Sequence, residues 1–149
     1  MLVRDVMFKR VFTVNDSADF QTIVKLLATK KISGITVVNK EGKLVGVISE
    51  KDLLYKLFPS EKKFYKNIEY YKNFERIEHE AENIGKLTAK HIMTKNVITI
   101  EPGRHVLVAC SLMIINNIRR LPVVDHGKLV GIVTMGSLYK HYLSSFFKK

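Results

Sequence analysis

The sequence has few cysteines, no histidine cluster and no long apolar run, and each shortage excludes a class of protein. Cys110 is the only cysteine, so an internal disulfide is excluded and a reducing compartment is favoured. The five histidines are scattered and show no metal-ligand spacing. No apolar stretch approaches the roughly 20 residues that cross a bilayer, and charges interrupt the N-terminus too often for a signal peptide. We therefore expect a cytoplasmic protein without a metal site or a membrane span.

Acidic residues are also scarce: the sequence has 14 of them and 25 lysines and arginines, which gives a net charge of +11. Such an excess favours anionic partners, namely nucleotides, nucleic acid or acidic protein surfaces. The lysines are spread along the whole chain, however, which is equally typical of a solvated surface. A hydrophobic share of 46% over 149 residues is ample for a core, so we expect one compact domain or two small units that share a core.

A repeat organises the rest of the sequence. "KLVGVIS" at 43–49 returns as "KLVGIVT" at 128–134, and "DVM" at 5–7 corresponds to "HIM" at 91–93. Between these anchors, "TV" is matched by "TI" and "VV" by "VV" in the same order. Two copies of one supersecondary unit are the economical explanation.

Each copy predicts the order β-α-β-β-α, which is an α+β fold. Short β-rich stretches ("RVFTV", "NVITI") precede helical patterns, and Ser17 is the expected N-cap of the first helix. Two strands around an Asn- or Asp-containing turn then form a hairpin, and a short helix follows. One such unit cannot bury both faces of its sheet, so we expect two units packed back to back. The residues expected to face the core are Phe20, Ile23, Val24 and Leu27 in the first helix and Val106, Ala109, Cys110 and Met113 in the second.

An insert separates the copies, which gives repeat 1 at 1–58, a helical insert at 59–86 and repeat 2 at 87–149. The insert's apolar residues recur every three or four positions, which predicts one amphipathic helix that begins at Ser60 and ends at Gly85. Its lysines and aromatics resemble a nucleic-acid stacking surface, but the acidic "ERIEHEAE" favours a packing face. Docking on its own module, a dimer interface and a lid over a cleft all remain open. The apolar positions are Phe64, Ile68, Tyr71, Phe74, Ile77, Ala81 and Ile84.

With these motifs in order and repeated, the chain resembles a CBS-domain pair, or Bateman module. The resemblance rests on "DVM" and "HIM", on "RRLPVVD", and on the endings "GVISEKDLL" and "GIVTMGSLY". It implies two repeats related by pseudo-two-fold symmetry, with clefts that bind AMP, ADP, ATP, S-adenosylmethionine or NAD(H). It also implies a regulatory protein rather than an enzyme, and a homodimer. Because the repeats and the insert occupy the chain, we expect any regulated protein to be bound in trans.

The ligand signature of that family is a Ser or Thr followed three residues later by Asp, which Ser49 and Asp52 match. A carboxylate can accept hydrogen bonds from both ribose hydroxyls, and a hydroxyl with free N–H groups at a helix start suits phosphate. The same Ser-x-x-Asp pattern is also a capping box, with Ser49 as N-cap. Both interpretations stay open, and one residue can serve both roles.

The second copy has Thr134 and Ser137 at these positions, so it lacks the carboxylate and predicts a poorer site. By resemblance, phosphate is contacted just before the "LPV" strand of the other repeat, where Arg119 and Arg120 stand; their equivalents, Ser33 and Gly34, carry no charge. Arginine suits forked phosphate recognition. One good site would therefore combine Asp52 with the two arginines. The alternative is that the arginines are solvated surface charges.

Weaker candidates surround these positions. Thr13 and Thr99 precede the first helix of each copy and are polar candidates. Four apolar residues are candidates for an adenine sandwich, although we expect most of them to be core: Ile35, Val47, Val97 and Leu121.

These observations predict a sensor of adenine nucleotides that needs no cofactor and has no catalytic residues, since no nucleophile–base pair is evident. Two rivals remain. A nucleic-acid-binding protein would use the basic surface and bind with steep salt dependence. A structural module with a decayed site would use Ser49 and Asp52 only as caps.

Overall fold

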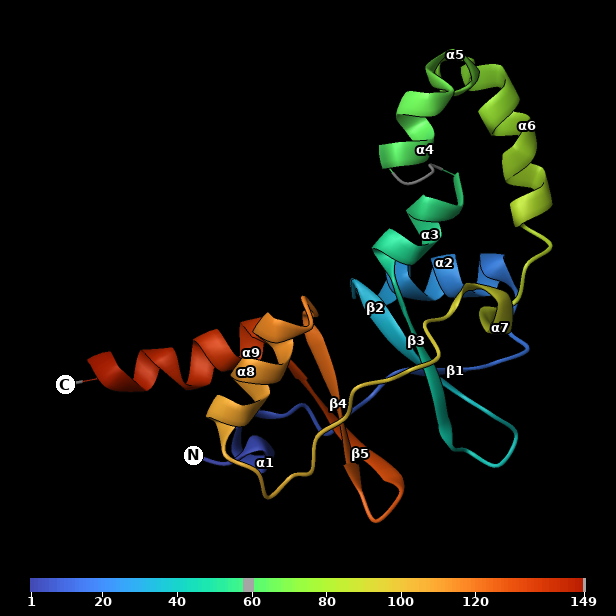
Figure 1. Ribbon diagram of the computed structural model, residues 1–149. Coiled ribbons are helices and arrows are strands. Elements are labelled where there is room, and N and C mark those ends of the chain that lie inside the picture. Colours follow the sequence, from blue (N-terminus) through green and yellow to red (C-terminus); the bar gives the residue numbers. More distant parts are fainter. Residues whose placement is uncertain (58–60, 149) are drawn as a thin grey trace. The chain divides into compact units, whose positions relative to one another are not determined.

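The computed structural model describes residues 1–57 and 61–148 (Figure 1). The chain forms two compact units. The split unit comprises Met1–Phe12 and Asn96–Lys149, and the continuous unit comprises Thr13–Lys95. Both contain helices and strands, which confirms the predicted α+β class.

The continuous unit is built on a three-stranded sheet. β1 (Thr13–Asn15) pairs in parallel with β2 (Gly34–Val38), and β2 pairs antiparallel with β3 (Leu44–Ser49). α2 (Phe20–Lys30) is the crossover that two parallel neighbours require. The predicted hairpin is thus confirmed. The predicted first strand at 10–14 is shorter than expected, because regular pairing begins only at Thr13.

α2 begins at Asp19, whose side chain accepts a hydrogen bond from the Thr22 N–H (2.7 Å). The prediction of Ser17 as N-cap was wrong, because its hydroxyl donates to Asn15 Oδ1 (2.8 Å). Ile23 and Leu27 are buried as predicted and Phe20 is half-buried, but Val24 is 40% exposed. Each helical residue is rotated by about 100° from the one before it, which turns Val24 away from the buried centre at Ile23.

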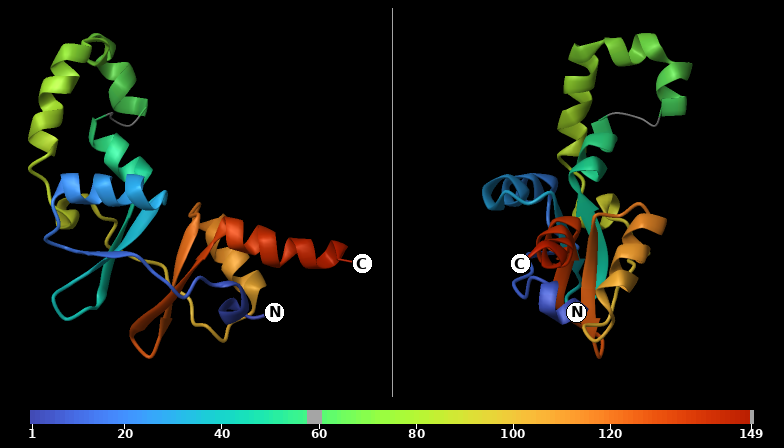
Figure 2. Two further views of the ribbon diagram at one scale, coloured as in Figure 1. Left: turned by 180° about the vertical axis from the view of Figure 1, so that it is seen from behind. Right: turned by 90° about the vertical axis from the view of Figure 1, so that its left-hand side faces the viewer.

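After β3 the chain continues into α3 (Glu50–Leu57) and then the insert, α4 (Glu61–Lys66), α5 (Ile68–Lys72) and α6 (Phe74–Ile84), which projects away from the sheet (Figures 1 and 2). The prediction of one continuous helix was wrong. Asn73 starts a new helix by accepting a hydrogen bond from the Arg76 N–H (3.1 Å), a typical role of asparagine. Gly85 follows α6 as predicted, whereas Ser60 lies outside the described residues.

Among the side chains that the structure describes, the predicted apolar face of the insert is only partly buried; those of Phe64 and Tyr71 lie outside this description. α6 packs against α3, with Ile77 buried. Ile68, Ala81 and Ile84 are half-buried, and Phe74 is exposed. The breaks between the short helices change the rotation of the face, so the stripe read from the sequence is not continuous.

The split unit contains α1 (Val3–Val6), α8 (Val106–Ile115), β4 (Arg120–Asp125), β5 (Lys128–Thr134), α9 (Met135–His141) and the 3-10 helix η1 (Leu143–Phe147). β4 and β5 form the predicted antiparallel hairpin. The strand predicted at 96–100 is reduced to one parallel bridge between Ile100 and Val123. Val106, Ala109 and Met113 are buried as predicted, and Cys110 is half-buried and packs against this core. The core of this unit consists of Val3, Val6, Ile100, Val106, Ala109, Met113, Leu121, Val123, Val133 and Leu138.

Each unit contains the opening segment of the other repeat. In the split unit, the Phe8 N–H donates to Ile132 O (2.9 Å) and the Ile132 N–H donates to Phe8 O (3.0 Å). In the continuous unit, α7 (Ala89–Ile92) leads into Thr94, which exchanges the same two bonds with Val47 (2.9 and 3.1 Å). The repeats read from the sequence and the compact units therefore divide the chain differently.

A methionine that recurs in both copies packs on a glycine that also recurs in both. Gly131 lies under Met7, so a Cβ there would meet Met7 Sδ at 2.6 Å and Phe8 O at 3.0 Å. Gly46 lies under Met93, where a Cβ would meet Met93 Sδ at 2.4 Å. The methionine of "DVM" or "HIM" therefore packs on the glycine of a "KLVG" segment, and this contact occurs once in each unit.

Candidate functional site

The Ser49–Asp52 turn joins β3 to α3. The Ser49 N–H and the Ser49 hydroxyl both donate to Asp52 Oδ2, at 2.7 and 3.0 Å, and the Asp52 N–H lies 3.4 Å from Ser49 Oγ. These are the bonds of a capping box. The capping role that the sequence predicts is therefore present. Ser49 engages only one carboxylate oxygen, and both side chains are half-buried.

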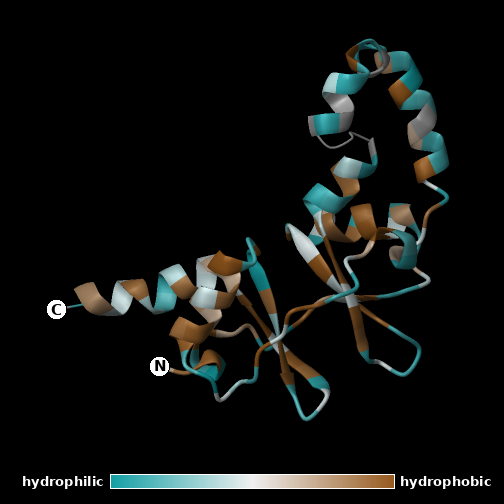
Figure 3. Cartoon of the chain, in the orientation of Figure 1, coloured by the Kyte–Doolittle hydropathy of each residue, from teal (hydrophilic) through white to brown (hydrophobic). Residues whose placement is uncertain are grey.

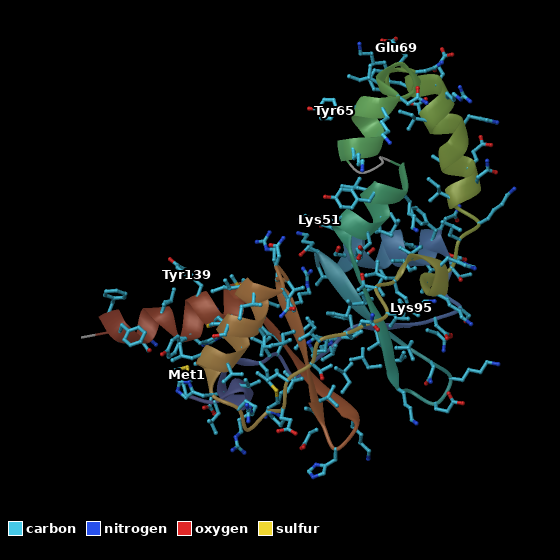
Figure 4. The ribbon with its side chains drawn as sticks, in the orientation of Figure 1. Met1, Lys51, Tyr65, Glu69, Lys95 and Tyr139 are labelled. Atoms are coloured by element: carbon cyan, nitrogen blue, oxygen red, sulfur yellow. The ribbon has the colours of Figure 1, made fainter. Side chains whose placement is uncertain are left out.

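The neighbours of this turn follow from strand pairing. Gly34 lies opposite Ser49 in the β2–β3 register, and the Glu50 N–H donates to Ser33 O (3.0 Å). Lys51 lies in the first turn of α3 beside Asp52 and is exposed (Figure 4). The continuous unit thus groups a carboxylate, a hydroxyl and one lysine around the start of an eight-residue helix.

The equivalent turn in the split unit closes on itself. The Thr134 N–H donates to Ser137 Oγ, the Ser137 N–H donates to Thr134 Oγ1, both at 3.0 Å, and the Ser137 hydroxyl donates to Thr134 O (2.9 Å). Ser137 is buried. Its hydroxyl proton is therefore already used, which agrees with the expectation that this turn is the poorer ribose contact.

The two arginines lie beside that second turn. Arg120 pairs with Thr134 in the β4–β5 register, and the Met135 N–H donates to Arg119 O (3.1 Å). They occupy the places that Gly34 and Ser33 take in the other unit, as the sequence comparison predicts. Asp52 belongs to the continuous unit and the arginines belong to the split unit, so their joint contact with one ligand stays a prediction.

The remaining candidates divide by burial. Ile35 and Leu121 are fully buried core residues, and Val47 and Val97 are half-buried. Thr13 and Thr99 are exposed. The expectation that most of the apolar candidates are core was wrong, because two of the four, Val47 and Val97, are only half-buried.

Sequence reasoning missed two histidine caps. His91 Nδ1 accepts from the Thr88 N–H (3.2 Å), and His105 Nδ1 accepts from the Leu107 N–H (3.3 Å) at the start of α8. Ser, Thr, Asp and Asn are the residues that signal a cap, so a histidine at a helix start does not indicate one in the sequence.

Burial raises the pKa of the Cys110 thiol, which disfavours the reactive thiolate. Among residues 1–57 and 61–148 no group of three metal-ligating side chains is found, and no helix there is long and apolar enough to span a bilayer.

The CBS domain matches the chain twice, at residues 3–58 and 89–144. The chain therefore belongs to the CBS-domain family.

Several known proteins are similar to most of this chain. A protein of Methanocaldococcus jannaschii is 37% identical over 150 residues, which cover 93% of this chain and 89% of the relative. Longer relatives also exist in that organism, and the chain spans only 41% of one and 38% of another.

Solved structures agree in fold. CBSX2 of Arabidopsis thaliana in complex with AMP has a TM-score of 0.74 and 30% identity, over 97% of this chain and 98% of that one. The CBS domain pair of protein MJ0100 in complex with 5′-methylthioadenosine and S-adenosyl-L-methionine has a TM-score of 0.72 and 29% identity, over 99% and 98%.

Proposed function

We propose that this CBS pair is a regulatory module that binds an adenine nucleotide, AMP, ADP or ATP, and acts on a partner protein in trans. S-adenosylmethionine and NAD(H) are the alternative ligands. The observation that carries the proposal is the Asp52 carboxylate at the start of α3, where Ser49 engages only Oδ2. The AMP bound to CBSX2, whose solved chain matches this one over 98% of its length, supports the ligand class. Occupancy regulates by favouring one of two conformations.

In this proposal each polar group has one task. Asp52 accepts hydrogen bonds from the ribose hydroxyls, a charge-assisted contact. Arg119 and Arg120 contact the phosphate, and Ser49 adds a hydroxyl. Thr134 and Ser137 provide the weaker counterpart, because Ser137 is buried and already donates to Thr134 O.

Asp52→Ser tests the ribose contact without removing the cap. Serine closes the equivalent turn at position 137 with bonds of 3.0 Å, so we expect the melting temperature of Asp52→Ser to stay close to that of the parent. Losing a hydrogen bond to a charged group costs about 1.5–3 kcal/mol, so the Kd for AMP should rise by roughly 10- to 150-fold. Isothermal titration calorimetry measures this, and an unchanged Kd would sink the assignment.

Arg119→Gln tests the phosphate contact. We expect weaker binding of AMP with unchanged binding of adenosine, because only AMP carries the phosphate that the guanidinium recognises. Lys128→Gln is the matched control, since it removes one positive charge from an exposed residue of the same unit. Equal losses for AMP and adenosine in Arg119→Gln would contradict the assignment, as would equal losses in both variants.

The bonds between Ser49 and Asp52 also favour a structural module as the second candidate. That candidate predicts that no adenosine ligand raises the melting temperature of the parent, although a ligand specific for the folded form must do so by mass action. A thermal-shift screen with AMP, ADP, ATP, S-adenosylmethionine and NADH separates the two. Salt-dependent binding of DNA in place of these ligands would instead indicate the nucleic-acid alternative.

A further inference from the structure

The helices that follow the two equivalent turns are supported in different ways. α9, which follows the Thr134 turn, packs against α1 and α8 of its own unit, and its Leu138 belongs to the core of that unit. α3, which follows the Ser49 turn, packs against α6 of the insert (Figure 1). The insert therefore supports the helix whose start is assigned to the nucleotide.

The packing between α3 and α6 depends on few side chains. Leu53 of α3 and Ile77 of α6 are buried, with 9% and 7% of their surface exposed. The two residues after Leu53, Leu54 and Tyr55, are 54% and 63% exposed. Figure 3 shows hydrophilic colour over much of α6, with hydrophobic residues in between. Regions that bury few apolar side chains open locally at low free energy, so we expect α6 to separate from α3 more readily than the sheet unfolds.

The nucleotide turn and this packing meet at consecutive residues. Asp52 closes the cap with Ser49, and Leu53 is the buried residue directly after it. α3 has eight residues, which is little more than two turns. A helix of this length is unstable by itself. Its order therefore depends both on the bonds at its start and on the packing of its side, and each of these favours the other.

The second repeat provides an internal comparison. Ser137 and Leu138 correspond to Asp52 and Leu53, but η1 follows α9 where the helical insert follows α3. Leu138 is 5% exposed within a core that the split unit needs for its own fold. The carboxylate and the insert thus occur in the same repeat, and the repeat that lacks the carboxylate fixes its helix without an insert.

We propose that the insert reports whether the nucleotide turn is occupied. This inference rests on the proposed function and adds its route: binding at Asp52 is transmitted through α3 to α6, and from there to the regulated protein. A nucleotide that binds the ordered start of α3 stabilises this helix, and the ordered helix presents the side on which α6 packs. Such coupling is reciprocal, so separation of α6 from α3 also weakens nucleotide binding.

Hydrogen exchange of the full chain tests the coupling, with AMP as the probe. Isothermal titration calorimetry first gives the Kd for AMP. At 100 times this Kd, amide exchange in α6 should slow by up to about 100-fold, because AMP must dissociate before α3 and α6 separate. In Asp52→Ser, whose Kd is expected to be at least about tenfold higher, the same AMP concentration should slow exchange in α6 by about tenfold or less.

Ile77→Ala tests the reciprocal effect. It removes buried packing from α6, so the Kd values for AMP and for adenosine should both rise about fivefold or more, because the change acts on α3 and not on the phosphate contact. Glu78→Ala is the matched control, since Glu78 is the exposed neighbour on the same helix. Ile77→Val removes a single methyl group and should shift both Kd values in the same direction by less, which keeps the test valid if Ile77→Ala fails to fold.

The outcomes separate this inference from the proposed function. A parent chain that does not bind AMP overturns the proposed function and this inference with it. Binding of AMP with unchanged exchange in α6 overturns this inference alone. Equal Kd values for AMP in the parent, Ile77→Ala and Glu78→Ala also overturn it, because α6 would then have no influence on the nucleotide turn.

Discussion

At the scale of single residues, Asp52 and Ser137 show how one position serves different purposes in the two repeats. Both close a cap on the residue three positions earlier. The carboxylate accepts through one oxygen in that cap and keeps a second oxygen, whereas the hydroxyl of Ser137 spends its only proton on Thr134 O. Replacing Asp by Ser therefore preserves a helix start and removes a charged acceptor.

A second prediction at this scale concerns how the contribution of Asp19 to stability depends on pH. The hydrogen bond that the Asp19 carboxylate accepts from the Thr22 backbone N–H lowers the pKa of Asp19 below its ordinary value of 3.8. A lowered pKa in the folded state means that the carboxylate stabilises the fold above the ordinary value, and that this stability is lost as the pH falls through the lowered pKa. Asp19→Ala should thus lower the urea midpoint at pH 7, and the difference from the parent should shrink at acidic pH.

Ser17→Ala is the control for this experiment. Ser17 is the N-cap that the sequence predicted, but its hydroxyl bonds Asn15 Oδ1 and not the start of α2. Its effect on the urea midpoint should be smaller and should not change between pH 7 and acidic pH. A pH-independent difference for Asp19→Ala would contradict the cap assignment.

At the scale of elements, each unit is stabilised internally by the contact between the opening segment of one repeat and the hairpin of the other. Gly131→Ala tests it, because the new Cβ would lie 2.6 Å from Met7 Sδ and 3.0 Å from the Phe8 carbonyl. Such overpacking typically costs about 1–3 kcal/mol, so the free energy of unfolding in urea should fall by that amount.

Gly103→Ala is the matched control, since nothing lies within 4 Å of its Cβ position. Its stability should equal or slightly exceed that of the parent. If Gly131→Ala proved as stable as Gly103→Ala, the opening segment would not pack on β5 as described.

The hairpins could be predicted from the sequence because their signals are local, with dense Val and Ile around a turn of Asn, Asp and Gly. The insert was predicted wrongly as one helix because its apolar residues keep a helical period across Asn67 and Asn73, where the structure ends one helix and begins the next. The sequence could not predict that each opening segment packs on the hairpin of the other repeat. Comparing the two copies shows which residues correspond, but it does not show which copy each residue contacts. A related limit applies to the site. The correspondence of Arg119 and Arg120 with Ser33 and Gly34 could be read from the residues, whereas the joint use of the arginines with Asp52 came only from the family resemblance and stays a prediction.

At the scale of the whole molecule, the two repeats share a fold and differ in chemistry. The continuous unit carries the acidic turn at Asp52, and the split unit carries the two arginines. Duplication supplies two similar frameworks, and substitution at the turns gives them different polar groups.

A crystal structure of the chain grown with AMP tests the central claim most directly. The account predicts that the ribose hydroxyls lie within hydrogen-bond distance, 2.5–3.0 Å, of the Asp52 carboxylate. A structure in which AMP is ordered elsewhere on the chain, with Asp52 bound only to Ser49, would contradict it.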